Sequence, residues 1–100
     1  MKSSILVVED DPSIRNNLVE LLGEVGYDVA SADNGADGIA LVKARAPSLV
    51  LCDITLPKAD GYAVLRALRD DSSTSSVPLI FLTAKSERAD VRLGMNLGAD

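Results

Sequence analysis

Residues 5–12 read Ile5-Leu6-Val7-Val8-Glu9-Asp10-Asp11-Pro12, an unbroken apolar run that passes abruptly into three acidic residues and a proline. A run without polar alternation is typical of a strand buried on both faces of a parallel sheet. Asp11-Pro12 has the form of a helix start, with Asp11 as the N-cap and Pro12 at the first helical position. These eight residues therefore predict a buried strand, an acidic loop at its carboxyl end and a helix.

The same cycle of strand and helix recurs along the chain. Further strands are expected at residues 27–31, 49–52 and 77–82. Helices are expected at residues 12–25, 36–46, 61–70 and 86–97. Gly26 is expected to cap the first helix, and Asn34-Gly35 is expected to form a turn. The second strand is more polar than the others and is expected to lie at a sheet edge. Strict alternation of strands and helices predicts an α/β protein with a doubly wound parallel sheet.

The composition excludes several classes of chemistry. The chain has 100 residues, the length of one domain, with a net charge of −5, one cysteine and no histidine. Without histidine it has no Ser-His-Asp or Cys-His catalysis and no histidine-ligated zinc. The lone Cys52 cannot form an internal disulfide, which fits a reducing cytosol, and we expect it to pack as a small buried hydrophobe.

The charge and the lengths of the apolar runs limit the partners. An acidic chain with scattered lysine and arginine is poorly suited to bind a polyanion, so we expect no direct nucleic-acid binding by this domain. The apolar runs are far too short to span a bilayer. We therefore expect a cytoplasmic protein that makes no membrane contact.

Acidic and hydroxyl side chains stand where the predicted strands end. Glu9 and Asp10 follow the first strand, Asp53 follows the third, and Thr83 with Ala84 follows the fourth. In a doubly wound sheet the site lies at these carboxyl ends, and with the order 2-1-3-4 the first and third strands are neighbours at the switch point. Crowded carboxylates either raise their pKa values or bind a cation, for which Mg²⁺ is the natural choice. Asp53 is then the best-placed carboxylate nucleophile, and an aspartyl phosphate is the product that Thr83 and nearby backbone N–H groups would stabilise.

Four segments, at residues 5–11, 53–61, 81–84 and 98–100, resemble the receiver (phosphoacceptor) domain of two-component response regulators. The resemblance covers essentially the whole chain, and the order and spacing of the segments make it specific. It implies a flavodoxin-like fold with strand order 2-1-3-4. It also implies that the phosphoryl group comes from a histidine kinase or phosphotransfer protein, which supplies the histidine that this chain lacks. The output domain or partner protein cannot be read from these residues.

The resemblance implies roles for four residues around the metal. Asp53 corresponds to the phosphoacceptor, Asp10 to a direct Mg²⁺ ligand, and Glu9 to the partner carboxylate that often acts through water. Thr55 corresponds to the position whose backbone carbonyl completes the metal shell and whose side chain tunes the lifetime of the phosphoryl group.

Two further roles fall at the end of the fourth expected strand. Thr83 corresponds to the switch hydroxyl that moves toward the phosphate, and Ala84 to the residue whose backbone N–H binds the phosphate. Lys85 follows at a position that the family fills variably, and it is given no role.

The chain departs from the family in two places. Ala59 stands where the family usually has methionine, which is a change in packing. After Asp100 the family continues into a fifth strand, a lysine that pairs with the phosphoryl group, and a fifth helix. We therefore expect residues 1–100 to be a receiver domain truncated before its fifth β-strand and fifth α-helix. The apolar edge at residues 79–82 then needs cover, so we expect marginal stability and association as a homodimer or by strand exchange.

Two other functions fit parts of the pattern. A Mg²⁺-dependent phosphohydrolase of the haloacid dehalogenase type also uses an aspartate nucleophile at a strand end, but it requires a second aspartate where this chain has Thr55. A protein-interaction module that works without phosphorylation is the alternative that the missing lysine favours. The receiver interpretation predicts a phosphoacceptor signalling domain rather than an enzyme, with at most self-catalysed phosphotransfer and autodephosphorylation.

Overall fold

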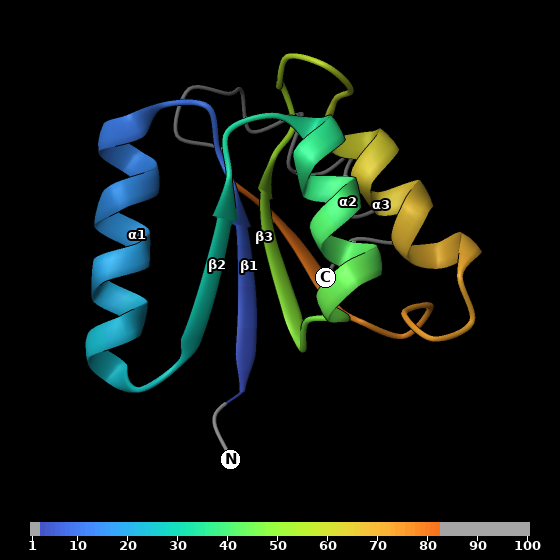
Figure 1. Cartoon of the computed structure of the whole chain (residues 1–100). Coiled ribbons are helices and arrows are strands. Elements are labelled where there is room, and N and C mark those ends of the chain that lie inside the picture. Colours follow the sequence, from blue (N-terminus) through green and yellow to red (C-terminus); the bar gives the residue numbers. More distant parts are fainter. Residues whose placement is uncertain (1–2, 83–100) are drawn as a thin grey trace.

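Four short strands pair into one parallel sheet in the order β2-β1-β3-β4 (Figure 1). The computed structural model describes residues 3–82 of the chain. The strands are β1 (Ser4–Val8), β2 (Asp28–Ala32), β3 (Leu49–Asp53) and β4 (Leu79–Leu82). Every pairing is parallel, so a helical crossover must connect each strand to the next. The predicted strand order 2-1-3-4 and the flavodoxin-like α/β class are confirmed.

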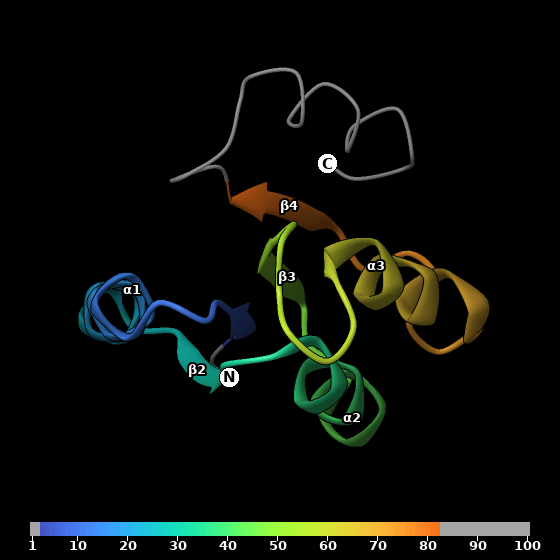
Figure 2. The same ribbon diagram turned by 90° about the horizontal axis from the view of Figure 1, so that it is seen from above.

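The helices lie on both faces of the sheet, as the doubly wound prediction requires. They are α1 (Pro12–Val25), α2 (Gly35–Arg45) and α3 (Gly61–Asp70). Seen from above, α1 lies on one side of the sheet, and α2 and α3 lie together on the other (Figure 2). The helix expected at residues 86–97 falls outside the described residues. Across residues 3–82, no helix has the length and apolar character needed to cross a membrane.

Local sequence signals account for the helix ends. The side chain of Asp11 accepts hydrogen bonds from the backbone N–H groups of Ser13 and Ile14, and Pro12 opens α1, as predicted. Gly26 ends α1 with a φ of 114°, a conformation that costs glycine little. The prediction of a turn at Asn34-Gly35 was wrong. Asn34 is the N-cap of α2, because its side chain accepts from the N–H of Asp37 and starts the helix one residue early.

The core lies between the sheet and the pair of helices α2 and α3. It is built from alternate strand residues and from the inward faces of these helices. Its largest members with no appreciable exposure are Leu6, Val8, Val42, Val50, Val64, Leu68 and Leu79. The other face of the sheet is less fully covered, since Leu21 and Val25 of α1 are 57% and 66% exposed. The most fully buried layer of the domain therefore lies beneath β1 and β3, whose carboxyl ends it supports.

Candidate metal centre

The candidate site lies where β1 and β3 run side by side and end. Val8, the last residue of β1, pairs with Cys52 of β3, so the residues that follow this pair, Glu9 and Asp53, lie at the same level. The helix that follows β1 packs on one face of the sheet, and the helix that follows β3 packs on the other (Figure 2). This reversal of winding opens a crevice at the strand ends, the usual binding place in a doubly wound sheet.

Three carboxylates converge at this point. One oxygen from each of Glu9, Asp10 and Asp53 lies within 4.8 Å of the others. Glu9 and Asp53 are buried and Asp10 is half-buried. The structure thus brings together the three acidic residues that the strand ends indicated. Their role as ligands stays a prediction.

Backbone N–H groups hold two of these carboxylates in place. The N–H of Ile54 donates to Oδ1 of Asp53 at 2.8 Å, and the N–H of Asp11 donates to Oε2 of Glu9 at 2.9 Å. Within residues 3–82, the other oxygen of Glu9, Oε1, is buried and has no hydrogen-bond donor. A buried carboxylate oxygen without a donor is costly, and a cation is one way to satisfy it.

The electrostatics of the three carboxylates also favour a bound cation. Burial raises the pKa of Glu9 to about 7, and the neighbouring carboxylates of Asp10 and Asp53 act in the same direction, against the N–H of Asp11. Below about pH 7 the metal-free site therefore holds a proton that a cation can displace. Three oxygen donors with no nitrogen or sulfur ligand match the preference of Mg²⁺, so these residues fit the metal implied by the sequence.

The expected contribution of Thr55 is from its backbone rather than its side chain. Thr55 is exposed in the loop two residues beyond Asp53, and the expected use of its backbone carbonyl stays a prediction. Thr83 and Ala84 lie outside the described residues. Leu82, the last described residue of β4, pairs with Asp53, and Thr83 follows it in the sequence.

Cys52, beside Asp53, is part of the core. It is fully buried, as predicted, and its Sγ donates to the backbone carbonyl of Asp53 at 3.2 Å. Burial raises the pKa of its thiol well above the usual range, and the nearby carboxylates add to the effect. The thiol is therefore neutral and unavailable as a ligand or nucleophile.

The sequence analysis missed two contacts that shape the site. Arg15 reaches back from α1 and donates from Nη1 to the backbone carbonyl of Glu9 at 3.0 Å. The loop after Asp53 closes on itself, because the N–H of Gly61 donates to the carbonyl of Ile54 at 2.7 Å. The Gly61 contact could have been suspected, since glycine after a loop often marks a close backbone approach. The sequence around Arg15 carries no comparable signal.

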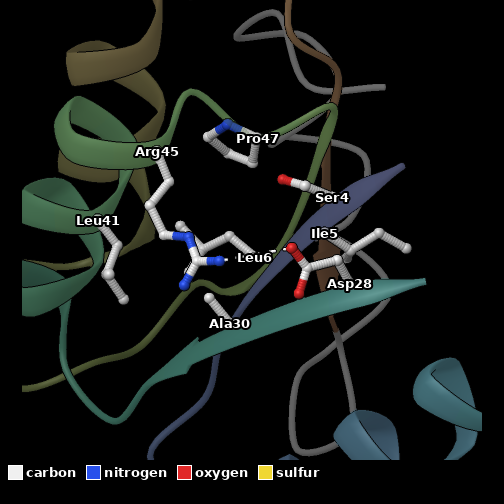
Figure 3. Close-up of a pocket in the computed structure, with 8 residues that line it drawn as sticks. All are labelled: Ser4, Ile5, Leu6, Asp28, Ala30, Leu41, Arg45 and Pro47. Atoms are coloured by element: carbon white, nitrogen blue, oxygen red, sulfur yellow. Dashed lines mark ion pairs between the residues drawn. The ribbon is translucent and has the colours of Figure 1, made fainter. Parts of the chain in front are cut away.

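At the opposite end of the sheet, the described residues form a smaller crevice. It is lined by residues at the starts of β1 and β2 and by the end of α2 (Figure 3). Arg45 forms an ion pair with Asp28 at 3.5 Å across it, and the space left is too small for a water molecule. The convergent polar groups are therefore at the carboxyl ends of the strands.

Comparison with known proteins agrees with this geometry. The family model described as response regulator receiver domain matches residues 5–100. The chain is 43% identical over 100 residues to the DNA-binding response regulator MtrA of Mycolicibacterium smegmatis, covering all of this chain and 42% of that protein. It therefore spans well under half the length of this curated relative.

Two solved structures are similar over nearly all of this chain. The chemotaxis response regulator CheY4 of Vibrio cholerae superposes with a TM-score of 0.89 at 25% identity, over 99% of this chain and 82% of that one. The receiver domain of the sensor histidine kinase PA1611 from Pseudomonas aeruginosa has a TM-score of 0.88 at 28% identity, over 100% of this chain and 82% of that one. The latter structure has a magnesium ion coordinated in its active site cleft.

Proposed function

The chain belongs to the response regulator receiver domain family of two-component signalling, and from this premise we propose that Asp53 accepts a phosphoryl group in a Mg²⁺-dependent reaction. The observation that carries the proposal is the convergence of Glu9, Asp10 and Asp53 at the ends of β1 and β3. The metal bound by a similar receiver domain in its active site cleft supports it as well.

Glu9, Asp10 and Asp53 would hold the metal, together with the backbone carbonyl of Thr55. When bound, Mg²⁺ offsets the negative charge of the cluster and can hold an oxygen of the phosphoryl group. The N–H of Ile54 restrains Asp53 through Oδ1 and so orients its carboxylate for attack. In the reaction an oxygen of Asp53 forms a bond to phosphorus as the bond from phosphorus to the imidazole nitrogen of a phosphohistidine breaks. The imidazole leaves with that electron pair.

Two residues after β4 complete the proposed site. Thr83 would donate its hydroxyl to the phosphoryl group, and Ala84 would donate its backbone N–H. The pairing of Leu82 with Asp53 supports this assignment, since Thr83 follows Leu82 directly in the sequence. A hydroxyl drawn inward by the phosphate would shift the domain between two populations, which is how a receiver acts as a switch.

The phosphodonor must be a histidine outside residues 1–100 or a small phosphorylated molecule, because these residues contain no histidine. A histidine kinase or phosphotransfer protein is the proposed donor. The similar MtrA is a DNA-binding response regulator, but most of its length lies outside the region matched by this chain. We assign DNA binding to no part of residues 1–100, and we place their function in the cytoplasm.

We also propose that one further strand and helix complete this domain and bring the lysine that pairs with the phosphoryl group. The two similar receiver structures support this, since the chain covers 82% of each. Ile80 of β4 is 41% exposed on the less covered face of the sheet. This exposure is consistent with a face that the further strand and helix would cover. Without that layer, association with a second copy would protect this edge.

The experiment is phosphorylation by a small acyl phosphate with Mg²⁺, followed by intact mass measurement. We expect one added phosphoryl group that hydroxylamine removes and that EDTA prevents. Asp53→Asn should abolish it, and Asp70→Asn, which removes an exposed carboxylate at the end of α3, should not. An unmodified wild-type chain that binds Mg²⁺ would favour a phosphorylation-independent interaction module. Steady hydrolysis of phosphomonoesters would favour a phosphohydrolase.

A further inference from the structure

Arg15 makes a specific contact with the backbone between two proposed metal ligands. It lies one turn into α1, where its own N–H donates to the carbonyl of Asp11 at 2.9 Å. Its guanidinium Nη1 donates to the carbonyl oxygen of Glu9 at 3.0 Å. We propose that Arg15 is a positioning residue of the metal centre: it fixes the peptide that joins Glu9 to Asp10 and so sets the direction of both carboxylates. This inference rests on the proposed function of the site.

The position of that peptide explains why it needs an anchor. β1 ends at Val8, so the carbonyl of Glu9 lies beyond the regular hydrogen bonds of the strand. The N–H of Glu9 is held by the carbonyl of Ala32 at 3.0 Å, and Arg15 holds the carbonyl at the other side of the residue. A peptide unit is planar, so fixing its C=O direction also fixes the Cα atoms of Glu9 and Asp10.

The contact joins the site to α1 at two points. The N–H of Asp11 orients the Glu9 carboxylate through Oε2, and Asp11 is the N-cap from which α1 begins. Arg15 adds a bond from the next turn of the same helix to the Glu9 carbonyl. Groups that orient metal ligands in this way typically change metal affinity by about 10- to 100-fold when they are removed.

The positive charge of Arg15 and its hydrogen bond predict opposite effects on the affinity for Mg²⁺. A cation near a metal centre repels the metal, so if charge alone mattered, removal of Arg15 would tighten Mg²⁺ binding. If Arg15 acts by positioning, its removal weakens binding. The sign of the change therefore separates the two roles.

Replacing Arg15 with a smaller side chain should not create a buried cavity in the core. Its side chain is half-buried and borders an open groove of about 460 Å³, shared with Ser31, Asp33 and Asp37. Arg15→Met keeps much of the apolar stem and removes every donor. Arg15→Lys keeps the charge and one donor group. Arg66→Met is the matched control, because Arg66 is an exposed arginine on α3.

The test is calorimetric titration of the full 100-residue chain with MgCl₂ alone. We expect Arg15→Met to raise the Mg²⁺ dissociation constant about tenfold, Arg15→Lys to restore most of the affinity, and Arg66→Met to match wild type. Urea unfolding in EDTA, run in parallel, shows how much stability each variant loses without metal. A role confined to folding would lower that stability and leave the dissociation constant unchanged.

Equal or tighter binding by Arg15→Met overturns the positioning role while leaving the metal site intact. If Arg15→Met does not fold, Arg15→Gln decides by the same sign: weaker binding supports the proposal, and equal or tighter binding overturns it. A wild-type chain that binds no Mg²⁺ would contradict the proposed function itself. Asp10→Asn should abolish binding, and so shows that the Mg²⁺ bound by wild type is held at this site.

Discussion

The backbone N–H of Gly35 donates a hydrogen bond of 3.0 Å to the carbonyl oxygen of Pro57. This contact fastens the first residue of α2 to the loop that follows Asp53. A Cβ atom at Gly35 would lie only 1.8 Å from the carbonyl oxygen of Ala59, so the loop leaves no room for a side chain there. Helix α2 and the loop beside the proposed phosphoacceptor are thus joined through Gly35.

Gly35→Ala should therefore be strongly destabilising. The new methyl group meets backbone rather than a flexible side chain, and we expect the free energy of unfolding to fall by about 2–3 kcal/mol. Urea denaturation measures it. Gly23→Ala is the control, since a Cβ at Gly23 in α1 meets nothing within 4 Å, and it should stabilise by about 0.5–1 kcal/mol. Equal effects of the two substitutions would contradict the close approach at Gly35.

The same loop is strained at Ala59. Its φ of 96° is a left-handed conformation that an alanine rarely adopts, whereas glycine adopts it freely. Ala59→Gly should raise the free energy of unfolding by about 1 kcal/mol. Ala67→Gly, the same chemical change inside α3, should lower it by about as much. The prediction fails if Ala59→Gly is as harmful as Ala67→Gly.

The raised pKa of Glu9 predicts a specific dependence of stability on pH in the absence of metal. Between about 4.5 and 7 the folded chain keeps a proton on Glu9 that the unfolded chain has lost. Stability from this group is therefore fully present below that range and is lost as the pH rises through it. The loss should be at most about 3 kcal/mol, since each unit of pKa shift corresponds to about 1.4 kcal/mol.

Urea denaturation in EDTA at several pH values tests this, with Glu9→Gln as the reference. The glutamine variant cannot ionise, so the difference between it and wild type isolates Glu9 from the other carboxyl groups. We expect wild type to lose stability relative to Glu9→Gln as the pH rises toward 7. A constant difference across the range would show that Glu9 titrates normally.

Cys52 should resist alkylation in the folded chain. Its thiol is fully buried, bonded to the carbonyl of Asp53 and kept neutral by its raised pKa. We expect iodoacetamide to react more than about a hundredfold more slowly than in urea, because reaction requires opening of the core. As the chain has one cysteine, the modified mass reports on this site alone. Native reaction as fast as in urea would place Cys52 at the surface.

The sequence predicted well those features that depend on neighbouring residues or on burial of a whole strand. Helix α1 begins after Asp11, at Pro12, and is capped by Gly26 as expected, because capping depends on contacts within a few residues. The apolar run before Glu9 predicted a central strand, and the step from Cys52 to Asp53 placed a carboxylate at the end of its neighbour. Glu9, Asp10 and Asp53 could be brought together because the fold class fixes where strand ends meet.

Other features depend on contacts that the sequence does not display. The fourth strand begins at Leu79 rather than at residue 77, since the N–H of Val77 bonds to the carbonyl of Thr74 instead of to β3. Thr74, in a polar stretch, is nearly inaccessible, and its hydroxyl donates to the carbonyl of Leu68 at 2.9 Å. Periodicity identified the apolar side of α1 but gave no measure of how much of it is covered, as the exposure of Leu21 and Val25 demonstrates.

The central place of β1 has a consequence for synthesis of the chain. It precedes every other described strand, yet it pairs on one side with β2 and on the other with β3, which the ribosome adds much later. Until Leu49–Asp53 has emerged, Leu6, Val7 and Val8 lack one of the two strands that flank them in the folded sheet. The nascent chain therefore passes through a period in which this apolar strand is open to wrong partners, and holdase chaperones should bind it there.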